Sequence, residues 1–392
     1  MSDKRTGRPP SSPPQIALCG TMAPLSLRRC IVLNAAATKR FAKSGADPYR
    51  FLNMIIDIES SDQLLDYLRA TERIGSQEKP VVRTLKGGVS NKTVWLQPEQ
   101  GPAWVVKQAL AKLRVKSDWF SDPLRIGIEA DALRFLPSIT PPGTITPLVF
   151  EDREQNILAM EAVPPPHENW KERLLSGKID LALIQEFGEL LGRIHQRSYL
   201  RSDELRAKFS DRTFFHTLRL EPYYEYSSAV MPSAKPFLTE LVADTLNRQE
   251  TFVHGDFSPK NILIYQHKPI LLDHEVAHFG DPAFDLGFSL THLLSKAHHL
   301  PSNRLILFDA ALRYWDTYFG LVRESPWTTG LEHRAVKHTS ACLLARAVGR
   351  SPLEYLNDSE RSAQTHAALD LIEAAPATLS ELVEIFARRI ML

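Results

Sequence analysis

The 392-residue sequence contains few cysteines, no long apolar run and almost no net charge. Its three cysteines, Cys19, Cys30 and Cys342, are odd in number and far apart, which excludes a disulfide framework and a zinc spacing. No run of about 18 apolar residues occurs, so no transmembrane helix is predicted. The formal charge of +1 gives no bulk attraction to nucleic acid or membrane. We therefore expect a cytoplasmic protein from a reducing compartment.

The first 53 residues lack something else, because no acidic residue occurs between Lys4 and Ala46. Lysine, arginine, proline, serine and alanine dominate, and such a segment cannot bury much apolar surface. We expect residues 1–53 to be a disordered basic tail. Two alternatives stay open: a mitochondrial transit peptide, and a native start at Met54.

The remaining chain predicts two lobes, because its pattern changes near Pro164. Residues 54–163 read as a small β-rich lobe, in which a short helix begins at a possible Ser60/Gln63 capping box. Strands and one longer helix follow, at Val81–Leu85, Lys92–Leu96, Ala103–Gln108, Asp122–Leu136 (the helix), Leu148–Glu151 and Asn156–Met160. Residues 164–392 read as a larger, mainly helical lobe, and Ser351–Pro352 resembles the start of one of its helices. The predicted fold class is therefore bilobal α+β.

The most specific motif is the stretch HGDFSPKN, His254–Asn261, which is followed by an apolar strand that ends at Asp273. Asp256 is suited to orient a substrate hydroxyl, and Asn261 and Asp273 are suited to hold Mg²⁺. An aspartate in a loop can instead simply cap a turn. The spacing matches the catalytic loop and the metal-binding aspartate of the protein-kinase fold, which favours phosphoryl transfer.

The first lobe contains the matching nucleotide elements. The glycine-rich stretch Gly87-Gly88-Val89-Ser90-Asn91 separates two predicted strands, so its backbone amides can approach a phosphate, although it can also be a plain hairpin turn. Lys107 ends a strand where a kinase carries its phosphate-binding lysine, and Glu129 on the next helix can pair with it. Glu129 can alternatively pair with Arg125 one helical turn away.

Two further side chains near the motif have open roles. Glu275 can touch a second metal ion or be solvated. His195 on its apolar helix and His274 after the metal aspartate are better explained as packing residues than as ligands, because Mg²⁺ prefers oxygen.

Together these motifs resemble the aminoglycoside phosphotransferase and choline kinase group of small-molecule kinases, over about Val82 to Leu356. The resemblance implies a protein-kinase-like fold that binds ATP and Mg²⁺. It implies that the backbone near Glu161 and Val163 meets adenine and that Asp285 braces the catalytic loop.

The resemblance favours a small hydroxylated metabolite as the substrate. Only a short span separates Asp273 from Asp285, which leaves no room for the activation loop of a protein kinase. Methylthioribose kinase-like, homoserine kinase-like and choline kinase-like interpretations stay open. The acceptor pocket is expected in the helical lobe, with Asp281, His292, Arg346 and Arg350 as candidate lining residues.

Two other functions remain as alternatives. One is a catalytically idle nucleotide-binding member of the same fold, and the other is a protein kinase. Idle kinases usually lose one of the lysine, aspartate and asparagine residues of the site, whereas this chain keeps all of them.

Overall fold

The structure, a computed structural model, describes residues 55–391 apart from 87 and 116–117. All described residues belong to one compact unit of the chain. The predicted tail and Gly87 therefore lie outside the described residues. Among the described residues, no helix is long and apolar enough to span a membrane.

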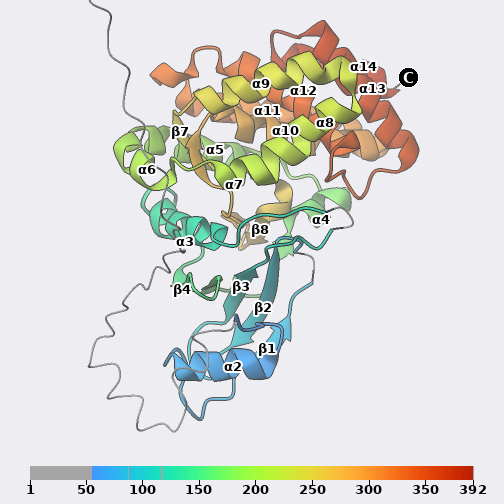
Figure 1. The fold of residues 1–392 in the computed structure, drawn as a ribbon. Helices are drawn as coiled ribbons and strands as arrows, with labels where there is room; N and C mark the ends of the chain where they lie inside the picture. Colours follow the sequence, from blue (N-terminus) through green and yellow to red (C-terminus); the bar gives the residue numbers. More distant parts are fainter. Residues whose placement is uncertain (1–54, 87, 116–117, 392) are drawn as a thin grey trace, which may run out of the picture. The chain divides into compact units, whose positions relative to one another are not determined.

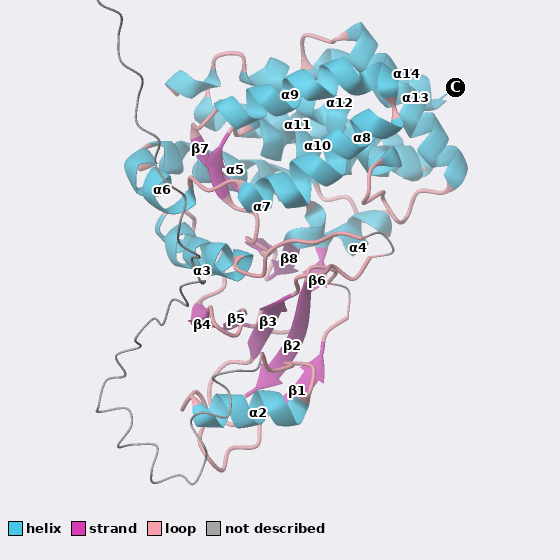
Figure 2. Cartoon of the chain, in the orientation of Figure 1, coloured by secondary structure: helices cyan, strands magenta, loops and turns pink. Residues whose placement is uncertain are grey.

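The first lobe is built on a five-stranded antiparallel sheet with the order β1-β2-β3-β5-β4 (Figure 2). Its strands are β1 (Val81–Thr84), β2 (Asn91–Gln97), β3 (Trp104–Ala109), β4 (Leu148–Asp152) and β5 (Ile157–Glu161). The helix α3 (Arg125–Phe135) lies between β3 and β4 in the chain, and the short helix α2 (Ser61–Ala70) precedes β1. Each predicted strand is present within one residue at either end. The alternation of apolar residues therefore predicts this lobe well.

A separate small core holds α2 against the sheet. Leu64 and Leu68 of α2 pack with Val94 of β2 and Val106 of β3, which face each other in the antiparallel register. The capping box expected at Ser60 does not form, because the Gln63 side chain accepts a hydrogen bond from the Asp57 amide instead. The helix begins where predicted without that cap.

The second lobe is mainly helical and lies above the sheet in Figure 1. Its helices are α4 (Trp170–Leu175), α5 (Leu181–Tyr199), α6 (Ser202–Phe209), α7 (Thr213–Phe215), the π-helix η2 (His216–Glu225), α8 (Tyr226–Val230), α9 (Lys235–Asn247), α10 (Ala283–His299), α11 (Arg304–Val322), α12 (Leu331–Val348), α13 (Asp358–Ala374) and α14 (Leu379–Met391). Two small sheets complete it, one of β7 (Thr251–Val253) with β10 (His278–Gly280), and one of β6 (Glu168–Asn169), β8 (Ile262–Tyr265) and β9 (Lys268–Leu271).

These two small sheets hold the motif residues in place. The loop between β7 and β8 carries Asp256, and Asp273 follows the end of β9. Within the loop, the Phe257 ring stacks on the Phe187 ring of α5 at a centroid distance of 4.4 Å. Trp170 contacts the Phe187 ring from α4 at 4.8 Å. The catalytic loop is thus anchored in the large core by an aromatic side chain.

The prediction of a helix that starts at Ser351 is wrong. The chain from Ser351 to Leu356 forms no helix, and α13 begins at Asp358. Asn357 and Glu360 form the capping box there, with bonds of 2.9 and 2.8 Å between side chain and backbone. The Ser351 hydroxyl instead accepts a hydrogen bond from Arg346, so a tertiary contact replaces the expected cap.

Candidate active site

A cleft of about 620 Å³ opens between the sheet and the loops around β8 and β9. It contains most of the residues predicted to bind nucleotide or metal, namely Gly88, Ser90, Asn91, Lys107, Glu161, Val163, Asn261 and Asp273. Glu129 and Asp256 lie outside its wall. The structure thus brings together residues that are up to 185 positions apart in the sequence (88 to 273).

Lys107 on β3 lies between two carboxylates. Its Nζ atom is 2.7 Å from Oε1 of Glu129 on α3 and 2.9 Å from Oδ1 of Asp273. Glu129 therefore pairs with Lys107, and the alternative pair with Arg125 is wrong, because Arg125 contacts Glu275. The strand, the helix and the segment after β9 are joined by one ammonium group.

The two carboxylates share this ammonium unequally. Burial raises the pKa of Glu129 to about 7, against the opposing attraction of Lys107. Burial also pushes the pKa of Asp273 upward, but Lys107 and then Lys260 outweigh it, and the pKa falls below its ordinary value. Asp273 is thereby kept anionic, as a ligand of a divalent cation must be.

Asp273 has a left-handed backbone conformation with φ of 67°. Aspartate is among the few non-glycine residues that adopt this region with any frequency, and such residues often occur at functional sites. The conformation follows the end of β9, where the Leu272 amide donates to the Asn261 carbonyl at 2.9 Å. The two predicted metal-binding residues are thus linked through the backbone.

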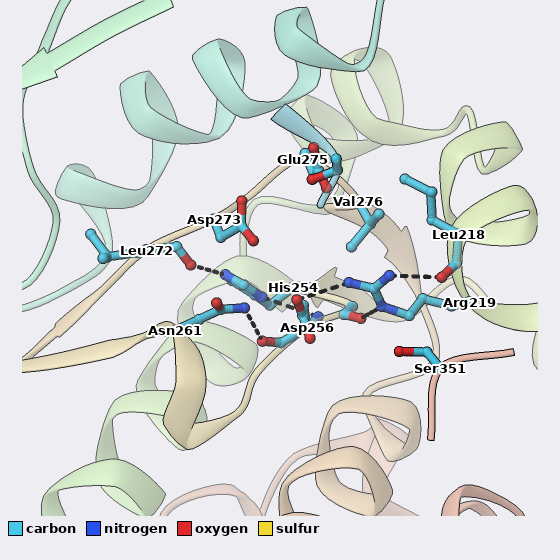
Figure 3. Close-up of polar contacts among 12 residues, drawn as sticks. Leu218, Arg219, His254, Asp256, Asn261, Leu272, Asp273, Glu275, Val276 and Ser351 are labelled. Carbon is cyan, nitrogen blue, oxygen red and sulfur yellow. Dashed lines mark hydrogen bonds and ion pairs between the residues drawn. The ribbon is translucent and has the colours of Figure 1, made fainter. Parts of the chain in front are cut away.

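The catalytic loop fixes the position of Asp256 through its own backbone (Figure 3). The Asp256 amide donates to Nδ1 of His254 at 3.2 Å, and Nε2 of the same ring donates to the Leu272 carbonyl at 3.2 Å. The Asn261 side-chain amide donates to the Asp256 carbonyl at 3.0 Å. Burial lowers the pKa of His254, which favours the neutral ring that this pattern of one acceptor and one donor requires.

Asp285, in the first turn of α10, braces the same loop as expected. Its two carboxylate oxygens accept the amides of His254 and Gly255 at 2.7 and 2.8 Å. His195 lies 3.4 Å from the carboxylate and also bonds to Tyr318, which makes it the buried packing residue that its sequence pattern predicts.

Gly255 occupies the position at which the catalytic loop of most protein kinases carries an arginine. Its geometry explains this difference. Its φ is 74°, and a Cβ atom there would lie 2.9 Å from the Val276 side chain. Both conditions disfavour any larger residue. A guanidinium group nevertheless lies beside the loop, supplied by Arg219 from η2.

Arg219 is a site residue that the sequence analysis did not predict. Its Nη2 atom is 2.9 Å from Oδ2 of Asp256, and its Nε atom donates to the Gly255 carbonyl at 2.7 Å (Figure 3). The side chain is 9% exposed. η2 is a π-helix with Pro222 inside it, and such wide turns are frequent at functional sites. No motif surrounds Arg219 in the sequence, so only the fold reveals this contact.

Arg125 at the start of α3 is a second unpredicted residue. It is fully buried, and its guanidinium group donates to the backbone carbonyls of Ser90, Leu110, Ser121 and Asp122. Its Nε atom also lies 3.0 Å from Oε2 of Glu275. Because Ser90 belongs to the glycine-rich loop, Arg125 connects that loop to the segment that follows Asp273.

Glu275 is therefore not solvated, and that alternative is wrong. Its side chain is 6% exposed, and Oε2 accepts hydrogen bonds from Arg125 and from the Asn91 side chain, the latter at 2.9 Å. His274 beside it is fully buried in contact with the His254 ring, in accordance with a packing role.

The oxygen atoms around Asp273 and Asn261 fit a hard divalent cation. Asn261 uses its amide nitrogen on Asp256, and Asp273 uses Oδ1 on Lys107. Within the described residues, no hydrogen bond occupies the side-chain oxygen Oδ1 of Asn261 or the carboxylate oxygen Oδ2 of Asp273. Both atoms can serve as metal ligands without breaking a contact.

The backbone near β5 also fits an adenine ring. The Glu161 amide is already used, donating to the Pro147 carbonyl at 2.9 Å. The Val163 amide, two residues on, donates no hydrogen bond within the described part of the chain, and Val163 lines the cleft. A free amide at a buried edge is suited to a heteroaromatic acceptor.

Three comparisons place this geometry among known proteins. The phosphotransferase enzyme family matches residues 81–321. A methylthioribose kinase of Bacillus velezensis is 27% identical over 244 residues, which cover 55% of this chain and 60% of the relative. Methylthioribose kinase 2 of Oryza sativa subsp. japonica is 23% identical over 263 residues, which cover 59% of this chain and 61% of the relative. The chain thus matches about three fifths of the length of these curated relatives.

A solved structure confirms the fold. An amicoumacin kinase, determined in complex with AMP-PNP and Ca²⁺, has a TM-score of 0.50 and 14% sequence identity, with 76% of this chain and 90% of that chain covered. At this identity the likeness concerns the fold alone. It agrees with the predicted bilobal arrangement of a sheet-based lobe and a larger helical lobe.

Proposed function

Because the chain belongs to the phosphotransferase enzyme family, we propose that it transfers the γ-phosphoryl group of ATP to a hydroxyl group of a small molecule. The observation that carries the proposal is the convergence of Lys107, Asn261 and Asp273 on one cleft, with Asp256 held next to Asn261. These are the residue types that phosphoryl transfer requires, and each is held by partners that fix its position. The alternative of a catalytically idle protein is less favoured, because all four of these residues are present and lie together.

Each side chain has a role that its contacts support. Lys107, held by Glu129, is positioned to contact the α- and β-phosphates, while the amides after Gly88 approach them from the loop. Asn261 and Asp273 would hold Mg²⁺, which neutralises charge on the phosphates. Asp256, fixed through its amide, its carbonyl and Arg219, is positioned to orient the acceptor hydroxyl.

The segment after Asp273 supports a small-molecule acceptor. Residues 274–298 are all buried, from the turn after Asp273 through most of α10. A protein kinase needs an exposed activation segment here, on which a peptide can bind. The buried segment favours a pocket of limited size in the helical lobe.

The candidate acceptor residues divide into two groups. Asp281 pairs with Arg334 at 3.0 Å, so its carboxylate is already committed to that ion pair. Arg350 pairs with Glu221 at 2.8 Å. His292 and Arg346 are buried on α10 and α12 and form no ion pair within the described residues. The second pair is the better candidate for acceptor contacts.

A coupled assay of ATP consumption with a library of small alcohols and sugars tests the proposal. Methylthioribose is the first probe because the curated relatives are methylthioribose kinases. Homoserine, choline and generic peptides complete the panel. The Asp256→Asn variant serves as the blank, and turnover of peptides without any small-molecule turnover would overturn the proposal.

A further inference from the structure

Two buried cations in the helical lobe lack a carboxylate partner. Lys296 of α10 is fully buried and Arg346 of α12 is 8% exposed. Within residues 55–391 as described, neither has a carboxylate oxygen within ion-pair distance. The other buried lysine and arginine side chains all have one; they are Lys107, Arg125, Arg219 and Arg334. Because an unpaired buried charge is costly, this difference calls for an explanation.

The hydrogen-bonding capacity of both cations is largely unused. Lys296 Nζ donates once, to the His292 carbonyl at 3.1 Å. Arg346 donates through Nη1 to the Tyr223 hydroxyl at 3.2 Å, to the Ser351 hydroxyl at 2.8 Å and to the Ser351 carbonyl, while its buried Nε atom has no partner. The buried hydroxyl of Tyr355 also has no partner, and its ring lies 5.3 Å from Lys296 Nζ. Several donors with free capacity therefore occur together.

This cluster lies on the acceptor side of Asp256. The guanidinium groups of Arg346 and Arg219 lie 5.5 and 5.8 Å from the same ring, that of Tyr223, and Arg219 is bonded to Asp256. Ser351, which binds Arg346, is drawn with Asp256 and Arg219 in Figure 3. Arg346 and the arginine that holds Asp256 therefore share one neighbour, the Tyr223 ring.

The groups around the cluster are mostly basic. Burial lowers the pKa of His292 well below its ordinary value, and Lys296 and Arg346 lower it further. Burial also lowers the pKa of Lys296 to about 7; Lys171 acts in the same direction and Glu354 in the opposite one. Glu354 already forms an ion pair with Lys171. An added anion would restore the balance that the protein itself does not provide.

We propose that the acceptor carries an anionic oxygen group, a carboxylate or a phosphate, which is bound by Arg346 with Lys296 and the Tyr355 hydroxyl around it while the acceptor hydroxyl faces Asp256. This inference rests on the proposed function and names its substrate class. A guanidinium group suits either anion, because its fork of N–H donors matches two oxygens. An amine-bearing acceptor would be repelled by the same cations.

The test compares related five-carbon acceptors that carry different charges. ATP consumption is measured with ribose, ribonate, ribose 5-phosphate and 1-amino-1-deoxyribitol as the neutral, carboxylate, phosphate and cationic members. We expect the highest kcat/KM for ribonate or ribose 5-phosphate, and their ratio separates the two anions. A higher kcat/KM for the neutral or the cationic member than for both anions would overturn the inference while leaving the kinase function intact.

Variants assign the effect to the cluster. Arg346→Gln and Lys296→Met should raise the KM of the anionic acceptor roughly tenfold to a hundredfold, since a hydrogen bond to a charged group is lost. The KM for ATP should not change. Arg346→Lys should restore part of the loss. Lys337→Met, on the same helix but in an ion pair with exposed Glu240, is the matched control and should behave as wild type. Equal KM increases for neutral and anionic acceptors would overturn the inference.

Two further measurements keep the outcome decisive. Tyr355→Phe removes only the unpartnered hydroxyl, so it serves if Arg346→Gln does not fold, and it should raise the same KM by a smaller factor. If no acceptor of any charge is phosphorylated, the proposed function fails. Calorimetric titration with ribonate then decides the inference separately: binding that Lys296→Met abolishes supports it, and absence of binding to the wild type refutes it.

Discussion

The nucleotide side and the proposed acceptor side of the site differ in how their buried cations are paired with carboxylates. On the nucleotide side, Lys107 and Arg125 are matched by Glu129, Asp273 and Glu275. On the proposed acceptor side, Arg219 has Asp256, but Lys296 and Arg346 have no carboxylate partner within the described residues. The carboxylates on the nucleotide side suit the divalent metal ion that accompanies ATP, because such an ion prefers oxygen ligands. An unbalanced set on the other side indicates what the acceptor must bring.

Histidine shows the same contrast. All 13 histidines of the chain follow residue 163, so the sheet-based lobe described here contains none. In the helical lobe burial lowers the pKa of several of them, including His278 and His338, to about 4 each. The second lobe therefore contains buried imidazole rings whose neutral form is favoured, a kind of group that the described part of the first lobe lacks.

The largest expected effect comes from removing an anion from the nucleotide side. Asp273→Ala should lower kcat on the order of a thousandfold or more, because a metal ligand and a partner of Lys107 are lost together. Steady-state ATP turnover and a thermal melt measure activity and folding separately. Asp244→Ala, an exposed aspartate on α9, is the control. Near-normal turnover in Asp273→Ala would contradict the site assignment.

The next effect tests Arg219, which forms an ion pair with Asp256, the proposed catalytic residue. Arg219→Met should lower kcat roughly a hundredfold with little change in the KM for ATP, since Asp256 loses the partner that fixes its orientation. Arg219→Lys keeps the charge but not the full set of bonds, so its kcat should lie between the two. A changed KM for ATP with normal kcat would place Arg219 outside the acceptor half.

A smaller loss of activity, joined to a loss of stability, is expected at Arg125. Arg125→Met leaves Glu275 buried without its cation, which should lower the free energy of unfolding by about 3–5 kcal/mol. The double variant Arg125→Met/Glu275→Gln should recover part of this, because the stranded charge is removed. Denaturant unfolding measures both. An identical loss in the single and double variants would show that Glu275 is not the partner that matters.

The smallest effect concerns pH and the helical lobe. The folded pKa of His338 lies below its ordinary value, so its contribution to stability is present above about pH 6.5 and is lost as the pH falls toward 4. The stability difference between wild type and His338→Gln should shrink over this range by on the order of 3 kcal/mol. Chemical unfolding at several pH values tests this. A pH-independent difference would show that folding does not shift the pKa of His338.

The sequence predicted the fold well because local patterns carry it. The strands around Lys107 alternate in polarity, and the HGDFSPKN stretch is contiguous. The predictions from the sequence failed where a contact with a distant residue replaced a local one. Ser351 was predicted to cap a helix, but its hydroxyl accepts a hydrogen bond from Arg346. The Gln63 side chain accepts a hydrogen bond from the Asp57 amide rather than from the Ser60 amide.

The two unpredicted arginines illustrate the same limit. Arg125 and Glu275 are 150 positions apart, and Arg219 and Gly255 are 36 apart. No spacing rule links such residues, because only the packed fold brings them together. Lys107 could be predicted because its role is tied to the end of a strand, whereas an arginine that serves a distant carboxylate carries no local signal.

The contacts of Arg125 with the glycine-rich loop have a consequence for how nucleotide binding is timed. A loop that closes over phosphates normally loses conformational entropy when the ligand arrives, which weakens binding and slows association. Here the carbonyl of Ser90 and the side chain of Asn91 are held by the protein's own groups, Arg125 and Glu275. Ser90 and Asn91 should therefore need little reordering when a nucleotide binds, which favours fast association.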